Sequence, residues 1–343
     1  MSSGTGLKYR DIQRIFNTEV TKMALLKAES DGRIPKADRI SYGKSSITHR
    51  IWPLESVSII GEKYGFLEKP TSPSTICVFS TKGGVLKSTI SLNIARMYAL
   101  HNIKTCVIDL DPQGDTSRNL GFSIPEDEIE DLTDVDKYEN EIENLASFFH
   151  KKSKLEDIIQ NTELPTLDVI LSSSALIPLM DSLNAVVRRE YWLKENVINN
   201  LYKMGYDLVI IDLAPSWNIY TSNSITAASL LVSPLECKIA HYRNCKEFNN
   251  QLTRFCETMK ITDQKRIFIP TRVSSQRKVS VQIRQFYASN IPDCSMVSIR
   301  ESVFGEEAIA TRKSILEYCP TKTVAEDMRE FLVEVNQKLQ KSV

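Results

Sequence analysis

The chain has 343 residues, of which 42% are hydrophobic and 25% are charged, and its formal net charge is zero. This composition is typical of a soluble globular protein and excludes a collagen-like or disordered chain, and no apolar run approaches the 18 residues of a membrane span. The first residues lack the apolar block of a secretion signal. We therefore expect a cytoplasmic protein whose seven cysteines, which show no CxxC spacing, stay reduced.

The charge is unevenly distributed along the chain. Ten acidic residues and a single lysine lie between Glu126 and Glu143, whereas residues 264–292 contain six basic residues and no acid. Because local charge matters more than the total for contact with nucleic acid, a net charge of zero does not exclude DNA binding.

The first 70 residues predict a small helical domain. Apolar residues recur at helical spacing at residues 12–16, 20–30 and 54–64, with a turn-rich basic stretch before the third segment. The Pro/Ser-rich segment at residues 69–74 is the best candidate for a domain boundary. We therefore expect an N-terminal domain over residues 1–70.

Residues 75–343 predict an α/β domain. Short apolar runs alternate here with longer amphipathic segments, which is typical of parallel strands joined by crossover helices. We expect a doubly wound, mostly parallel sheet, with two short helices at residues 145–149 and 155–159 in the acidic insertion. The expected strands are residues 75–80, 104–110, 167–171, 207–213, 230–235, 266–270 and 294–299.

The first of these strands runs into a glycine-containing loop and then into a helical pattern. In such a unit the backbone N–H groups of the loop and the positive end of the helix dipole bind phosphate. Lys87 would reach the β- and γ-phosphates of a nucleotide, and Ser88 would bind Mg²⁺. The expected nucleotide-binding residues are Lys82, Gly83, Gly84, Val85, Leu86, Lys87, Ser88 and Thr89.

Carboxylates stand at the ends of two later strands. Asp109 and Asp111 share one face of the carboxyl end of the second strand, and Asp212 ends another. Ligands bind at the carboxyl ends of the strands in such sheets. An Asp in this place is more often a turn former, but with the phosphate loop upstream we expect Asp212 to hold the water shell of Mg²⁺.

These residues give the chain a resemblance to the ParA/MinD family of deviant Walker ATPases, whose pattern is KGGxxK(S/T)T, then DxDPQ, then an Asp ending the next strand. The resemblance covers residues 75–339 and implies the P-loop NTPase fold with ATP, ADP and Mg²⁺ as ligands. It implies three catalytic residues. Lys82 is the signature lysine that crosses a dimer interface, Lys87 binds phosphate in line, and Asp111 positions or activates the attacking water.

The resemblance also implies a metal site and a switch. Ser88, Asp109 and Asp212 would support the Mg²⁺ shell, and Gln113 with Gly114 would belong to a nucleotide-sensing segment. Two departures stand out from the family pattern. Leu86 occupies the place where most members have glycine, although the large plasmid ParAs also carry a bulky residue there. In addition, the sequence LAPS replaces the commoner DTPP after Asp212.

ATP hydrolysis does not identify the molecule on which the ATPase acts, because this fold is found in proteins with several different functions. The absence of paired cysteines disfavours a metal-insertion or cluster-carrying relative. A MinD-like membrane-positioning ATPase would need a C-terminal membrane-binding helix. Residues 324–339 are amphipathic, but their polar face is mainly acidic, so we expect this helix to pack on the sheet and expect no membrane association.

DNA binding has two supports in the sequence. The basic stretch at residues 264–292 follows an expected strand, and ParA relatives carry DNA-binding basic residues in this part of the chain. We expect contacts to phosphates, without sequence preference, from one surface. Its residues are Arg272, Arg277, Lys278 and Arg284.

The second support is a resemblance of the N-terminal domain to the winged helix-turn-helix of the larger plasmid ParAs. The helix at residues 20–30 would be the second helix of the turn, and Arg33, Lys36 and Arg39 would contact DNA around a wing. A small packing or dimerisation module is the alternative interpretation of this domain.

Together these patterns favour a plasmid-type partition ATPase. An ATP-bound homodimer would coat DNA nonspecifically on the nucleoid, a ParB-type centromere-binding partner would stimulate slow hydrolysis, and the N-terminal domain would bind the operator of its own operon. The alternatives are a nucleotide-switched transcriptional regulator and a MinD-like membrane-associated ATPase.

Overall fold

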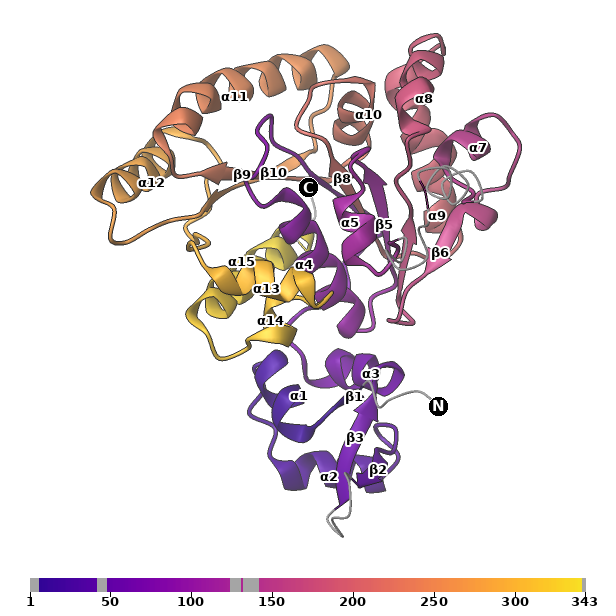
Figure 1. Ribbon diagram of the computed structural model, residues 1–343, viewed down its shortest axis with the longest axis vertical. Helices are drawn as coiled ribbons and strands as arrows, with labels where there is room; N and C mark the ends of the chain where they lie inside the picture. The colour runs from indigo at the N-terminus through magenta and orange to yellow at the C-terminus, as the bar shows by residue number, and fades with distance from the viewer. Residues whose placement is uncertain (1–5, 42–47, 124–130, 132–141, 341–343) are drawn as a thin grey trace.

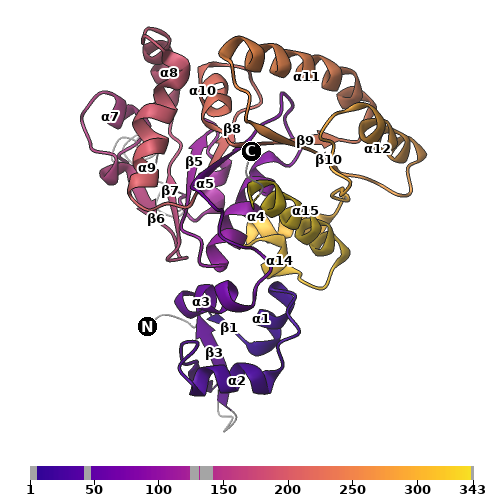
Figure 2. The ribbon, with the colours of Figure 1, turned by 180° about the vertical axis from the view of Figure 1, so that it is seen from behind.

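A seven-stranded sheet lies at the centre of the larger part of the molecule, with helices on both faces (Figures 1 and 2). The computed structural model describes residues 6–41, 48–123, 131 and 142–340. Strand order is β10-β9-β4-β8-β5-β7-β6, and neighbouring strands are parallel except for β6, which is antiparallel to β7. The strands are β4 (Ser74–Val78), β5 (Thr105–Leu110), β6 (Ile159–Asn161), β7 (Leu167–Ile170), β8 (Leu208–Leu213), β9 (Leu230–Glu236) and β10 (Lys265–Thr271).

The doubly wound, mostly parallel sheet expected from the sequence is thus confirmed. Six of the seven expected strands are present, and their observed ends differ from the expected ends by at most two residues. The exception is the segment 294–299, which is joined to β10 by one isolated bridge, from Cys294 to Phe268, while a second bridge pairs Val273 with Arg300 just beyond both segments. Pro270 in β10 accepts a hydrogen bond from the N–H of Ile299 but has no N–H of its own to donate. The ladder therefore breaks at the proline.

The two faces of the sheet are covered by different sets of helices, because successive strand residues point to opposite sides. In β4, Ile76 and Val78 belong to the core on one face, whereas Cys77 belongs to the core on the other. The first face carries α4 (Lys87–Leu100), α13 (Val303–Ala310), α14 (Ile315–Tyr318) and α15 (Thr323–Gln340). The second face carries α7 (Leu145–Phe149), α8 (Leu176–Asn184), α9 (Asn199–Lys203), α10 (Ile219–Ala227), α11 (Ile239–Met259) and α12 (Lys278–Asn290).

The structure tests two expectations for helices. The apolar side of α15 is buried in the same core as Ile267 and Ile269 of β10, so its packing on the sheet is confirmed. Of the two helices expected after the acidic insertion, the first is α7. The second, expected at residues 155–159, is present as a 3-10 helix over Glu156–Ile158, after which the chain pairs as edge strand β6. Residues 124–130 and 132–141 of the insertion lie outside the described part.

The N-terminal module (residues 6–65) contains more strand than its sequence suggests. Its helices are α1 (Tyr9–Ile15), α2 (Lys22–Ser30) and α3 (Leu54–Tyr64), and its strands are β1 (Gly6–Leu7), β2 (Asp38–Ser41) and β3 (Thr48–Pro53). The strands form an antiparallel sheet in the order β1-β3-β2. Two to six mostly exposed or half-buried residues give no strong alternating pattern, which explains why the sheet was missed.

The N-terminal module packs against the C-terminal end of α4 (Figures 1 and 2). Gly61 of α3 lies so close to this end that a Cβ atom added there would be 1.9 Å from the carbonyl oxygen of Leu100. His101 follows α4 and stands between the rings of Phe16 and Phe66, each with its centroid 5.0 Å away. One helix therefore joins the phosphate loop to the module.

Candidate nucleotide site

The loop between β4 and α4 has the geometry of a phosphate-binding loop. Gly84 has a φ of 72°, and Lys87 is the first residue of α4, so the N-terminus of a 14-residue helix faces the loop. The Lys87 side chain is 7% exposed, and its Nζ donates to the carbonyl oxygen of Lys82 at 3.2 Å. Burial lowers the pKa of Lys87, opposed by the carboxylates of Asp212 and Asp111 nearby.

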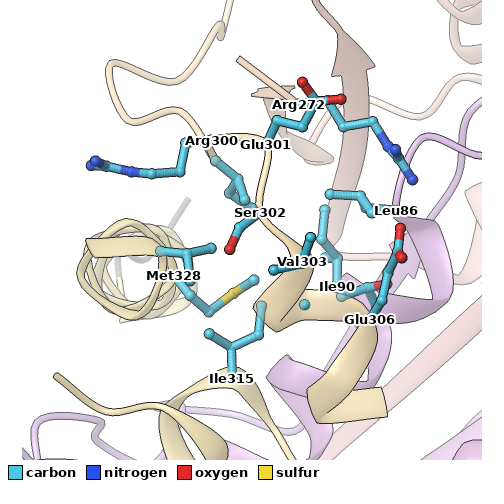
Figure 3. A pocket seen from close by; sticks show the side chains of 14 residues that line it. Leu86, Ile90, Arg272, Arg300, Glu301, Ser302, Val303, Glu306, Ile315 and Met328 are labelled. Carbon is cyan, nitrogen blue, oxygen red and sulfur yellow. The ribbon is translucent and has the colours of Figure 1, made fainter. Parts of the chain in front are cut away.

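Leu86 explains why glycine is usual at its position. It caps α4 in the left-handed region, with a φ of 74°. This conformation is free of strain for glycine and costs a residue with a Cβ atom about 1–2 kcal/mol. The Leu86 side chain turns toward a pocket beside the loop and packs against the core of the α4 face (Figure 3). Apolar contact thus offsets part of the backbone strain.

The carboxylates expected at the strand ends do come together. Asp109 of β5 and Asp212 of β8 are direct neighbours in the parallel register, and both are buried. Asp111 follows β5, accepts a hydrogen bond from the N–H of Gln113, and lies near enough to Lys87 to act on its pKa. The structure therefore brings Lys87 and all three aspartates to one edge of the sheet.

Hydroxyl groups satisfy the two buried carboxylates. Asp212 accepts from Ser91 at 2.9 Å and from Thr116 at 2.7 Å, and the Ser88 side chain also bonds to it. Asp109 accepts from both the N–H and the hydroxyl of Ser117 at 2.8 Å. Burial raises the pKa of both carboxyls, and the neighbouring Asp212 charge raises that of Asp109 further.

This donor set fits Mg²⁺. Carboxylate and hydroxyl oxygens are the ligands that a hard cation prefers, and Mg²⁺ commonly keeps several of its waters while one or two carboxylates hold it. Burial is the main cause of the raised pKa values of Asp109 and Asp212, and a divalent cation at Ser88 would add positive charge to that of Lys87 beside Asp212.

A pocket of about 320 Å³ opens beside the loop, and sequence reasoning missed most of its residues. It is enclosed by Leu86 and Ile90, by the segment 299–306 and by α15 (Figure 3). Ile90, Ile299, Val303, Ile315, Val324 and Met328 give it an apolar lining. No motif marks the segment 299–306, and only the fold brings it to the loop, about 210 residues later in the chain.

Arg272 lines this pocket (Figure 3), whereas the other three basic residues expected to contact DNA are not among its lining residues. Its Nε is 3.8 Å from a carboxylate oxygen of Glu236, and its φ of 50° is left-handed. Glu236 also pairs with Lys238 at 2.7 Å, and it lines a small cavity together with Lys82. Arg272 and Lys82 thus flank the phosphate loop on the Glu236 side.

Arg277 and Lys278 are exposed at the start of α12. Arg284 is on the same helix, but its guanidinium donates to the Ser298 hydroxyl at 3.1 Å and to the carbonyl oxygen of Met296 at 2.9 Å. Lys278 and Arg284 therefore lie on α12 and Arg277 is its N-cap, and the side chains of Arg277 and Lys278 are exposed to solvent.

In the N-terminal module, Arg33, Lys36 and Arg39 are exposed around the end of α2 and on β2. Arg33 forms an ion pair with Asp31 at 3.0 Å. Helix α2 adds the exposed residues Lys22 and Lys27, which sequence reasoning did not select. Their spacing of five residues does not place them on one face of a helix, so the pattern gave no signal for them.

No helix in the described ranges is long and apolar enough to cross a membrane. The described cysteines are free, and six of the seven are buried.

Comparison with known proteins decides the family. A profile described as "AAA domain" matches residues 73–265, more than half of the chain. The chromosome partitioning protein ParA of Caulobacter vibrioides is 29% identical over 163 residues, and SopA of Escherichia coli is 26% identical over 243 residues. The chain belongs to the ParA-type partition ATPases. These matches cover 48% and 68% of this chain.

The chain spans 56% of the length of the Caulobacter ParA and 60% of SopA. Among solved structures, an ATP complex of McdA from Cyanothece superposes with a TM-score of 0.66 at 18% identity, over 79% of this chain and 99% of McdA. At this identity the likeness concerns the fold, and it agrees with the P-loop α/β architecture of this ParA-type chain.

Proposed function

We propose that this chain is a Mg²⁺-dependent partition ATPase that binds and hydrolyses ATP at residues 82–89. The observation that carries the proposal is the meeting of Lys87, Ser88, Asp111 and Asp212 at the N-terminus of α4. Loop N–H groups, a helix dipole and a buried lysine would bind the β- and γ-phosphates. The ATP complex of McdA supports the same ligand for this fold.

Within this site each residue has a distinct task. Lys87 would clamp the phosphates, and Ser88 with Asp109 and Asp212 would hold Mg²⁺ and its waters, which neutralise phosphate charge. Asp111 would orient the attacking water, because it follows β5 on the same edge and keeps its side chain close to the loop. The apolar pocket lined by Ile90 and Val303 would bind the adenine base. ADP would remain in the site after hydrolysis.

Lys82 would act across a homodimer. Its side chain is half-buried and lines a small cavity together with Glu236 and His241. In the ParA/MinD family the corresponding lysine reaches the partner's phosphates. ATP would therefore close two copies of this chain around two nucleotides, and hydrolysis would release them.

The ATP-bound dimer would bind DNA without sequence preference through α12. Arg277 and Lys278 stand at the N-terminus of this 13-residue helix, where both the side-chain charge and the helix dipole attract phosphate. Arg284 would contribute less, because its guanidinium is already bonded. Arg272 would contribute to nucleotide binding instead of DNA binding. A ParB-type partner that stimulates hydrolysis, and location on the nucleoid, follow from likeness to the named partition proteins.

The N-terminal module would bind the chain's own operator. Two consecutive helices followed by the antiparallel pair β2–β3 form the arrangement that a winged helix-turn-helix requires. Helix α2 presents Lys22 and Lys27, and Arg33 follows its C-terminal end. Its attachment to α4 favours a second function, in which the nucleotide switches operator binding. We also propose that residues 69–74 form the boundary between this N-terminal DNA-binding domain and the ATPase domain.

One experiment separates these functions. Binding to random duplex DNA and to the upstream promoter is measured with ATP, ADP or no nucleotide, over a range of salt. Partition activity predicts binding to random DNA only with ATP, and falling steeply with salt. A regulator predicts promoter binding that survives without ATP. Binding to neither DNA in any nucleotide state would contradict both.

A further inference from the structure

The short helix α5 (Asp115–Asn119) holds the turn after Asp111 in place. The chain passes from Asp111 through Gly114, whose φ of 65° allows a sharp reversal, and then enters the helix. Its first buried residue is Thr116, which is fully enclosed. Any residue that fixes α5 therefore also fixes the position of Asp111 and Gln113.

Two adjacent hydroxyls of α5 attach it to the paired carboxylates. Thr116 Oγ1 donates to Asp212 Oδ2 at 2.7 Å, and Ser117 Oγ donates to Asp109 Oδ2 at 2.8 Å. The Ser117 bond duplicates one made by its own backbone N–H, so Asp109 keeps a donor from α5 without that hydroxyl. Among the described residues, the hydrogen bond from the Thr116 hydroxyl is the only one that joins α5 to Asp212.

Asp212 is consequently shared between two helices. Its Oδ1 accepts from Ser91, in the second turn of the phosphate-binding helix α4, and its Oδ2 accepts from Thr116. A carboxylate has about four lone-pair sites, so these donors and Ser88 leave room for a metal-bound water. The carboxylate thus connects the phosphate side of the site to the segment that carries Asp111.

We propose that Thr116 is a positioning residue, whose hydroxyl couples occupation of the Asp212 site to the placement of the turn at residues 111–114. This rests on the proposed nucleotide function. The role differs from filling space, since valine has nearly the shape of threonine and lacks only the hydroxyl. Thr116 donates to the Asp212 carboxylate and is not among the residues proposed to bind phosphate or Mg²⁺, so it would act on Asp111 through the backbone of α5.

The test compares Thr116→Val with Thr116→Ser, which keeps the hydroxyl. The control is Thr105→Val in β5, which removes another fully buried hydroxyl, one that donates to the carbonyl oxygen of Ile103. Each protein is examined by hydrogen exchange of segments 83–89 and 111–119, with ADP or ATP, in Mg²⁺ or in EDTA. Nucleotide affinity and hydrolysis are measured alongside.

In the parent and in Thr105→Val, Mg²⁺ and ATP should slow exchange in both segments. In Thr116→Val, segment 83–89 should still be protected while segment 111–119 is not. Affinity without Mg²⁺ should change by less than about twofold, and hydrolysis should fall roughly 10- to 100-fold, as expected for a misplaced reacting group. Thr116→Ser should restore both the protection and the rate.

The proposal is overturned if Thr116→Val protects segment 111–119 and hydrolyses ATP like the parent, or if Thr116→Ser is as impaired as Thr116→Val. If Thr116→Val does not fold, Thr116→Ala and Thr116→Ser replace it as a pair, and equal behaviour of the two overturns the proposal. A parent that shows no Mg²⁺-dependent nucleotide binding instead contradicts the proposed function, which is a separate outcome.

Discussion

The two ends of helix α4 use polar groups in opposite ways. At the N-terminal end, the loop N–H groups, Lys87 and Ser88 are gathered at one edge of the sheet, and Lys87 Nζ donates to a carbonyl oxygen of its own loop. At the C-terminal end, both nitrogens of His101 are occupied. Nδ1 donates to Met97 at 2.6 Å, and Nε2 accepts from the N–H of Phe66 at 3.1 Å.

The difference shows what each end is suited to do. An end that keeps donors available can accept an anion, whereas an end at which both nitrogens of the histidine are bonded is suited to holding a neighbour. Glycine has a different purpose at each end as well. Gly84 supplies a positive φ in the loop, and Gly61 supplies the absence of a side chain between α3 and α4.

The largest effect is expected from Gly61→Ala. The added Cβ would lie 1.9 Å from a backbone oxygen of Leu100, so α3 and α4 must separate, and we expect the free energy of unfolding to fall by about 3 kcal/mol. Urea unfolding measures this. Gly305→Ala in α13 is the matched control, because its Cβ would have 3.9 Å of clearance. Equal effects of the two changes would contradict the close contact.

Lys87→Ala tests the open end. Losing a buried, charge-assisted contact to phosphate should weaken ATP binding roughly 100-fold, or by about 3 kcal/mol, as measured by titration calorimetry. Lys82→Ala is the comparison, since a residue acting across a dimer should leave ATP binding nearly intact while abolishing ATP-dependent dimers and hydrolysis. A Lys82→Ala protein that dimerises and turns over normally would show that this lysine has been misassigned.

His101 should make the closed end sensitive to acid. Burial lowers its pKa from 6.5 to about 4, so the unfolded chain binds one more proton between these values. The stability contributed is complete above pH 6.5 and is lost as the pH falls toward 4. Between pH 7.5 and pH 5 the loss should be about 2 kcal/mol, and His101→Gln should lack it. Unfolding curves with the same pH dependence for both proteins would exclude this role.

The smallest effect is expected on the exposed helix α12, which belongs to neither end of α4. Arg277→Ala and Lys278→Ala should each lower the slope of log affinity for random DNA against log salt by about 0.9. Fluorescence anisotropy at several salt concentrations measures it. Arg272→Ala should leave the slope unchanged and weaken nucleotide binding instead. A reduced slope for Arg272→Ala, with unchanged nucleotide binding, would return that arginine to the DNA surface.

The sequence predicted those features of the structure that depend on local patterns, and it did not predict those that depend on contacts between distant segments. Apolar runs and the motif around Lys87 report local requirements, so they predicted the sheet, its strand ends and the gathering of Asp109, Asp111 and Asp212. The pocket wall at residues 299–306 and the position of Arg272 depend on which distant segments meet. The expected strand at residues 294–299 failed because Pro270 in its neighbour lacks an N–H, an effect visible only once the two segments are known to be adjacent.

The contact at Gly61 also limits which ATPase domains the N-terminal module could be combined with. A side-chain-free surface on α3 fits only a partner whose helix end presents a bare carbonyl, and Gly65 likewise admits the ring of His101, with a Cβ there only 2.2 Å from Cδ2. A graft of residues 6–65 onto another ATPase must therefore carry both glycines and meet a histidine at the matching position. Recombination at the linker alone would join two parts that do not fit.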